Sequence, residues 1–197
     1  MLRGLLLACA VALLAAGCFG GGDGADGGSV SASEGESLVL QQEDVGSEFT
    51  EFDRGVQRQV DFSPPRDDPK RFDRQGGWKA RFSRLGTRTT KGALVVSSLA
   101  DRFESADGAG EDFELYKSSL DQFVSAGGRV VPVSGLGDDA YAVAFTQGLK
   151  PNVIHHYAIA WRDGPVTASV TANGFRLTWP EALALARAQQ ERIASAS

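Results

Sequence analysis

The sequence predicts an α+β fold: a mostly antiparallel sheet with two main helices packed on one face. Three observations lead to this prediction. Several short runs alternate apolar and polar residues, which is the pattern of half-buried strands. Two longer stretches space their apolar residues three or four positions apart, as amphipathic helices do. Along the chain these elements follow the order strands, helix, several strands, helix.

The chain begins with a short apolar segment. Residues 5–14 are all apolar and follow Arg3. A bilayer span needs about 20 consecutive apolar residues, so this run is too short for one and has the length of a signal-peptide core. Small residues precede Cys18. We therefore expect residues 1–17 to be a signal peptide that is cleaved between Gly17 and Cys18.

A linker-like stretch follows the cysteine. Residues 19–36 are rich in glycine and serine, contain four acidic residues and contain no basic residue. Such a composition cannot bury enough apolar surface to offset the chain entropy lost on folding. We expect residues 18–36 to be a flexible tether with a mean reach of about 20–25 Å. The remaining residues, 37–197, have the length of one domain.

Alternating apolar residues and turn residues divide this domain into elements. Pro64, Pro65 and Pro69 mark a loop, and Asp163-Gly164 between two alternating runs marks a hairpin. In chain order we expect a short strand or helical turn at 38–46, strands at 49–60, 78–82 and 92–103, with a loop at 62–77, and later strands at 129–134, 140–147, 152–163 and 165–173.

The two helices are expected between and after these strands. Two glycines at 127 and 128 favour the end of the first helix. The second starts at Thr178, with Glu181 spaced for a capping box and Pro180 suited to the first turn. The apolar stripe of the first helix is Phe113, Tyr116, Leu120 and Phe123, and that of the second is Trp179, Ala182, Leu183, Ala186, Gln190 and Ile193.

The adjacent histidines His155 and His156 are the only histidines of the chain. Neighbouring side chains of a strand point to opposite faces, so these two cannot bind one metal ion together. The only cysteines are Cys9 and Cys18, which leaves none in residues 37–197. We expect structural or surface roles for both histidines, with a ligand-binding or pH-sensing role as the alternative, and we expect no metal and no cofactor.

The domain shows no catalytic motif. It contains neither a G-x-S-x-G sequence nor a phosphate loop, a dinucleotide fingerprint or the acidic spacing of a calcium loop. Asp138 and Asp139 follow two glycines and fit turn and capping roles. Small glycine-containing turns such as 108–110 fit a loop at a helix start. We therefore expect no enzyme and no catalytic residue, with a hydrolase of unrecognised type as the alternative.

Charge is unevenly distributed over a chain whose net charge is −5. Residues 58–91 hold ten basic and four acidic residues with aromatic residues among them. Such a segment, held close to a membrane, can contact anionic headgroups; the alternative is that the charges are scattered and solvated. Export and net acidity argue against nucleic acid as a partner. The residues expected to contact an anionic surface are Lys70, Arg71, Arg74, Lys79 and Arg81.

The segment before Cys18 resembles the lipobox of bacterial lipoproteins. The family pattern prefers leucine three residues before the cysteine, where this chain has Ala15 and places Leu14 one step earlier. The resemblance implies diacylglycerol on the Cys18 sulfur and an acyl chain, such as palmitate, on its amino group. It also implies a lipoprotein anchored at the extracytoplasmic side of the cell membrane.

The domain itself resembles the extracytoplasmic lipoproteins of actinobacteria, the extracellular sensor domains of mycobacterial receptor kinases and PsbP-like lipoproteins. The motifs are residues 42–46, 136–140 and 161–164 and a terminal helix ending near Ile193. The resemblance implies an antiparallel sheet packed with helices and no enzymatic activity. We expect a non-catalytic domain that binds a ligand or an envelope protein; the alternative is a cell-envelope assembly factor acting through residues 58–91.

Overall fold

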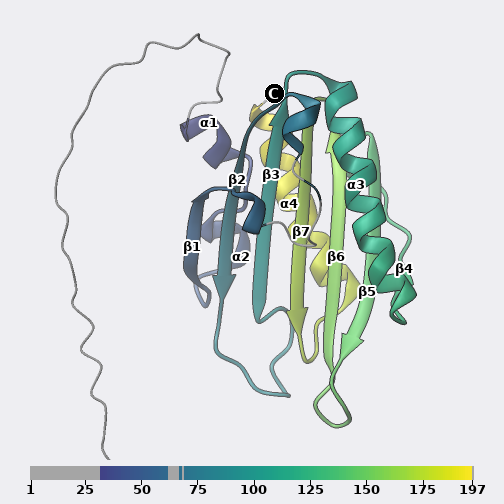
Figure 1. Ribbon diagram of the computed structural model, residues 1–197. Coiled ribbons are helices and arrows are strands. Elements are labelled where there is room, and N and C mark those ends of the chain that lie inside the picture. The colour runs from purple at the N-terminus through teal and green to yellow at the C-terminus, as the bar shows by residue number, and fades with distance from the viewer. Residues whose placement is uncertain (1–31, 62–66, 68, 197) are drawn as a thin grey trace, which may run out of the picture.

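A seven-stranded antiparallel sheet with strand order β1-β2-β3-β7-β6-β5-β4 forms the centre of the molecule (Figure 1). The computed structural model describes residues 32–61, 67 and 69–196. Every neighbouring pair of strands is antiparallel, which confirms the predicted α+β class. The strands are β1 (Thr50–Val56), β2 (Arg74–Ser83), β3 (Val95–Phe103), β4 (Arg129–Val130), β5 (Asp139–Gln147), β6 (Ile154–Asp163) and β7 (Val166–Gly174).

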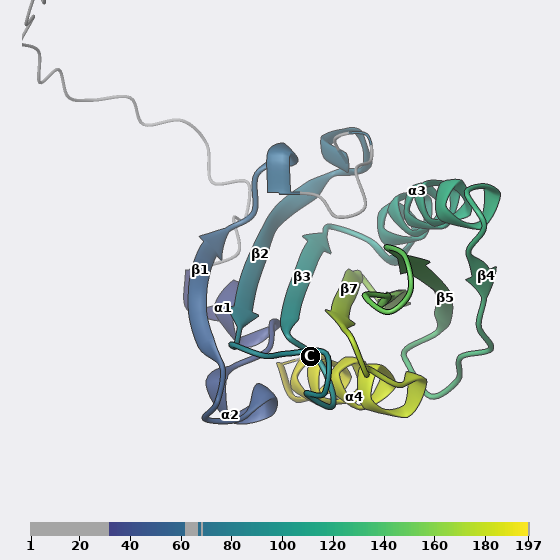
Figure 2. The same cartoon turned by 90° about the horizontal axis from the view of Figure 1, so that it is seen from below.

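The two long helices cover opposite faces of this sheet (Figure 2). On β6, Ala158 and Ala160 pack with the first long helix, whereas Ile159 and Trp161 pack with the second. The expectation that both helices share one face is therefore corrected. The central strands are apolar on both faces, and each face needs its own cover. The helices are α1 (Ala32–Ser37), α2 (Gln42–Val45), α3 (Ala106–Ser125) and α4 (Trp179–Ala196), with single turns η1 (Gln59–Asp61) and η2 (Pro69–Phe72).

The core under α4 also takes in the segment between α1 and α2. Residues 38–40 are buried there. The Leu40 N–H donates to Ser98 Oγ at 3.0 Å, and Ser98 Oγ donates to Gln189 Oε1 at 2.7 Å. Gln189 Nε2 in turn donates to the Leu99 carbonyl at 2.9 Å. This buried chain of hydrogen bonds joins the start of the domain, β3 and α4.

On the other face, α3 lies over β5, β6 and β7 and is fixed at both ends. Ser105 caps its start by accepting a hydrogen bond from the Gly108 N–H at 3.1 Å. A Cβ on Gly108 would collide with the carbonyl oxygen of Phe72, so glycine lets η2 pack closely here. Near the other end, Tyr141 OH donates to Asp121 at 2.6 Å. That hydrogen bond, together with burial and the charge of Asp121, raises the pKa of Tyr141 to about 12.

Other predicted elements are confirmed or adjusted. The helix start at Thr178 is confirmed, because the Thr178 N–H donates to Glu181 Oε2 at 2.8 Å. The strand expected at 129–134 is reduced to the two residues of β4. Residues 108–110 belong to α3 and not to a loop. Within the part of the chain that the structure describes, no helix is both long and apolar enough to cross a membrane.

Candidate functional site

The residues on which the anchoring prediction depends, Gly17 and Cys18, lie outside the described residues. Cleavage between them and acylation of Cys18 therefore stay predictions.

Two of the five basic residues expected at an anionic surface are instead paired with carboxylates on β1 and η1. Lys79 is only 6% exposed, and its Nζ lies 2.9 Å from Asp53 and 2.8 Å from Asp61. Arg81 lies 2.8 Å from the same Asp53 carboxylate and donates to the Asp61 carbonyl at 2.9 Å. These contacts hold η1 against β2 and neutralise both cations.

The carboxyl of Asp61 shows how strongly this cluster favours its charged form. Burial acts to raise the pKa of Asp61, but the hydrogen bonds from Lys79 and the Arg58 N–H, with the charges of Lys79 and Arg81, lower it below 3.8. The carboxylate is therefore ionised at neutral pH, and the cluster is internally balanced.

The other three expected contact residues are divided between the core and the surface. Arg74 pairs with Asp101, whose side chain is fully buried. Lys70 is exposed on η2, and Arg71 on the same turn lies over the Phe72 ring, 4.7 Å from its centroid. The five residues thus form no continuous basic face, and an anionic-surface contact stays a prediction for Lys70 and Arg71.

The two histidines do lie on opposite faces of β6, as the alternation predicts. His155 is aligned with Thr146 on β5 and Gly174 on β7. His156 is aligned with Phe145 and Asn173 on the same neighbouring strands. His156 therefore faces α3, and its neighbours build the site described next.

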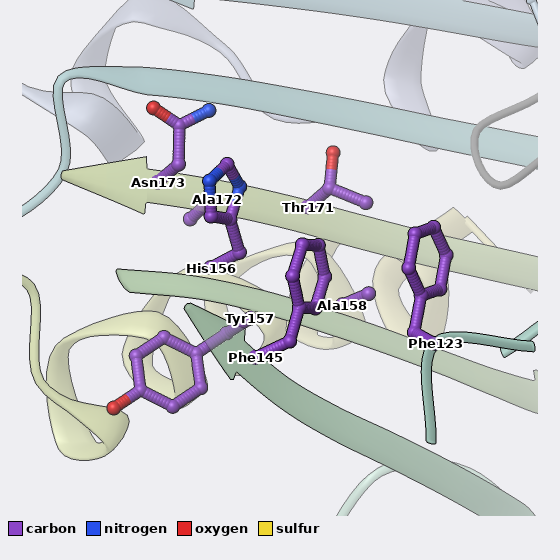
Figure 3. Close-up of a pocket in the computed structure, with 8 residues that line it drawn as sticks. All are labelled: Phe123, Phe145, His156, Tyr157, Ala158, Thr171, Ala172 and Asn173. Atoms are coloured by element: carbon purple, nitrogen blue, oxygen red, sulfur yellow. The ribbon is translucent and has the colours of Figure 1, made fainter. Parts of the chain in front are cut away.

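A row of three parallel rings marks the C-terminal end of α3 (Figure 3). The ring centroids of Phe123 and Phe145 lie 4.6 Å apart at an interplanar angle of 6°. Those of Phe145 and His156 lie 4.7 Å apart at 7°. The three side chains come from α3, β5 and β6, so the register of the sheet and the length of α3 together align them.

A cavity of about 150 Å³ lies beside these rings. Ala158 and Thr171 also line it, and Asn173 of β7 lies next to His156 of β6 (Figure 3). The lining residues Tyr157 and Ala172 belong to strand positions that face the α4 core. A second cavity of about 140 Å³ shares Phe145 and His156 as lining residues. The two rings thus border both hollows.

His156 is the polar centre of this site. Its Nε2 is buried and has no hydrogen-bond partner among the described residues. Burial lowers the pKa of His156 below 6.5, and the charge of His155 lowers it further. The ring is therefore neutral at neutral pH. A buried polar atom without a partner costs about 1–3 kcal/mol, which a ligand that supplies the hydrogen bond would recover.

Asp138 and Asp139, the adjacent carboxylates of the sequence, lie at the hairpin between β6 and β7. Arg162 pairs with Asp138 at 3.0 Å and with Asp139 at 2.8 Å, and Asp138 accepts the Gly164 N–H at 3.1 Å. Both carboxylates therefore fix the hairpin between β6 and β7. Among residues 32–61, 67 and 69–196, no group of three or more metal-binding side chains comes together. The cavity offers binding surface and not a set of acids and bases.

Sequence reasoning missed Phe145, Thr171 and Asn173 as site residues. For Thr171 and Asn173 the available signal was their position, on the face of β7 that also carries Thr167 and Ser169. Phe145 lies on the face of β5 that carries Tyr141 and Val143. Which of them would meet His156 depends on the strand register. The tight hairpin at Asp163-Gly164 fixes the β6–β7 register and with it the pairing of His156 with Asn173, whereas the longer connection at 148–153 leaves the β5–β6 register open.

No protein-family model and no curated protein matches this sequence. Among solved structures, the chain is similar to the crystal structure of the extracellular domain of PknH from Mycobacterium tuberculosis, with a TM-score of 0.58 and 13% sequence identity. The similarity covers 85% of this chain and 98% of that chain. At this identity it shows a shared fold, in agreement with the receptor-kinase part of the resemblance that the sequence motifs indicate.

Proposed function

We propose that this protein is a membrane-anchored, extracytoplasmic domain that binds a small ligand without transforming it. The binding site is the cavity at the end of α3. The observation that carries the proposal is the unpartnered, buried His156 Nε2 beside a cavity lined by two further rings. Concave sites in which aromatic side chains surround a few polar groups are the usual form of small-molecule sites.

Two further observations support the location and the absence of chemistry. The fold is shared with a domain described as extracellular, and the N-terminal sequence has the pattern of a lipoprotein signal. Among the described residues, no Asp, Glu, Lys or Arg lines the cavity. General acid–base catalysis by carboxylates is thus unsupported there. The internal pairing of Lys79, Arg81 and Arg74 weakens the alternative of an assembly factor acting through residues 58–91.

The test is an NMR titration of the full, isotope-labelled chain in detergent with a chemically diverse panel of small compounds. We expect at least one compound class to shift the resonances of Phe123, Phe145 and His156. Ala158→Leu, which fills the cavity from its β6 side, should abolish these shifts. The same substitution at the exposed Ala126 should leave them unchanged.

Two results would contradict the proposal. One is a panel in which no compound perturbs the cavity residues. The other is a folded Ala158→Leu protein that binds with unchanged affinity, which would place the binding elsewhere.

A further inference from the structure

The size of the cavity at the end of α3 suits a ligand of about one ring. A cavity of about 150 Å³ is large enough for a molecule the size of benzene. Larger planar systems would have to displace Phe145 or His156, whose rings border both this cavity and its neighbour. Phe145 is stacked between Phe123 and His156, so the row presents the edges of its rings to a flat ligand, and aromatic pairs gain from edge-to-face contacts.

The polar groups of the cavity call for an uncharged ligand with a hydrogen-bonding substituent. His156 Nε2 has no partner in the described part of the chain. The side chains of Thr171 and Asn173 line the same cavity, and Figure 3 shows both rising from β7 beside the row of rings. A hydroxyl group both donates and accepts, so it satisfies His156 in either tautomer. With no charged residue in the lining, an ionised ligand would lose its hydration without gaining a counter-charge.

We infer that the cavity binds an uncharged, single-ring aromatic compound with a hydroxyl group, which is the phenol class. This inference rests on the proposed function and specifies its ligand. The ring lies against Phe123 and Phe145, and the hydroxyl bonds to His156 Nε2.

The experiment compares phenol with toluene, which has the same size but no hydroxyl. Dissociation constants are measured by NMR titration of the full chain in detergent. We expect phenol to bind about tenfold more tightly than toluene, the factor typical of one hydrogen bond. In His156→Phe, which keeps the ring row and removes the nitrogens, phenol should lose its advantage and bind no more tightly than toluene, because its hydroxyl loses water without gaining this hydrogen bond.

The matched control is His155→Phe, the same change one residue away on the opposite face of β6. It should preserve the preference for phenol. If His156→Phe fails to fold, Thr171→Val serves in its place, because it removes a hydroxyl from the cavity with almost no change in volume. That variant should leave toluene binding unchanged and reduce phenol binding, because the hydroxyls of Thr171 and phenol can then no longer share a hydrogen bond. Equal binding of both compounds by the wild-type chain overturns the inference by itself.

Further probes test the charge and the source of the phenol ring. Benzoate and benzylammonium should each bind at least about tenfold more weakly than phenol; tighter binding of either overturns the uncharged class. N-acetyltyrosinamide tests whether the ring belongs to a tyrosine of a partner protein. Tighter binding than phenol assigns the ring to such a side chain, weaker binding assigns it to a free small molecule, and either supports the phenol class.

The failure of this inference can be told apart from failure of the proposed function. If other compounds of the panel shift the cavity resonances while phenol does not, the phenol class is wrong and the binding site stands. If nothing in the panel binds, both are wrong.

Discussion

At the scale of single residues, His155 and His156 show how one position along a strand decides a role. The sequence offered no reason to prefer either histidine. The sheet register places His156 between Phe145 and Asn173 under the end of α3, whereas His155 lies between Thr146 and Gly174. Burial lowers the pKa of His156, and the charge of His155 lowers it further.

This lowered pKa predicts a pH dependence of stability. The unfolded chain binds a proton at His156 as the pH falls through about 6.5, but the folded protein does so only at lower pH. The free energy of unfolding should therefore decrease as the pH falls from about 6.5 to the folded pKa. Urea unfolding between pH 7.5 and pH 5 measures it.

The comparison protein for that measurement is His156→Phe, in which this part of the pH dependence should be missing. A wild-type curve with the same slope as the His156→Phe curve would show that His156 titrates normally.

Lys79 and Arg81 illustrate why charge composition alone does not locate a basic surface. The segment 58–91 reads as basic, yet the carboxylates that neutralise these two residues lie 18 and 28 positions away in the chain. Asp53 belongs to the neighbouring strand and Asp61 to η1, so their approach follows from the fold. A basic residue can be recognised as exposed from the sequence only where the fold places no carboxylate beside it.

At the scale of elements, strands and long helices were largely predictable, but their arrangement was not. Alternation located β2, β5, β6 and β7 because turns with glycine separate them. The placement of the two long helices on opposite faces, however, was predictable. Nearly continuous apolar runs at 140–144 and 157–161 indicate strands that are buried on both sides. A sheet with two buried faces needs helices on both.

The cavity was beyond prediction for a different reason. It exists because α3 ends beside Phe145 and because β5 and β6 pair in the register that aligns Phe145 with His156. A shift of one residue in that pairing would turn either ring to the other face. Local sequence patterns do not fix such a register to the required precision.

Gln189 provides a prediction about how α4 is attached. Gln189→Leu has a similar volume but removes the hydrogen bonds to Ser98 and to the Leu99 carbonyl. Because these groups are buried, we expect a loss of about 1–3 kcal/mol in the free energy of unfolding. Urea unfolding measures the loss. The same substitution at the exposed Gln122 should change it by less than about 0.5 kcal/mol; similar losses in both variants would show that the buried bonds contribute nothing specific.

At the scale of the whole molecule, the anchoring prediction concerns where the domain is held. Cys18→Ala should move the protein from the membrane fraction to the soluble fraction, because the acylated residue is lost. Immunoblotting of fractionated cells measures the distribution. Cys9→Ala is the matched control, since it changes the other cysteine inside the apolar run and should leave the protein in the membrane. Membrane retention of the Cys18→Ala protein would exclude the lipid anchor.

The contacts that join α2 to α4 also bear on when the domain folds. Arg192 bonds to Asp44 across 148 positions of the chain, and Gln189 bonds to the Leu99 carbonyl across 90. The core on the α4 face therefore cannot be completed until Gln189 and Arg192 are present. Contacts of such long range slow folding. In a chain that crosses a membrane from its N-terminus, this face of the sheet would stay uncovered until α4 had crossed as well.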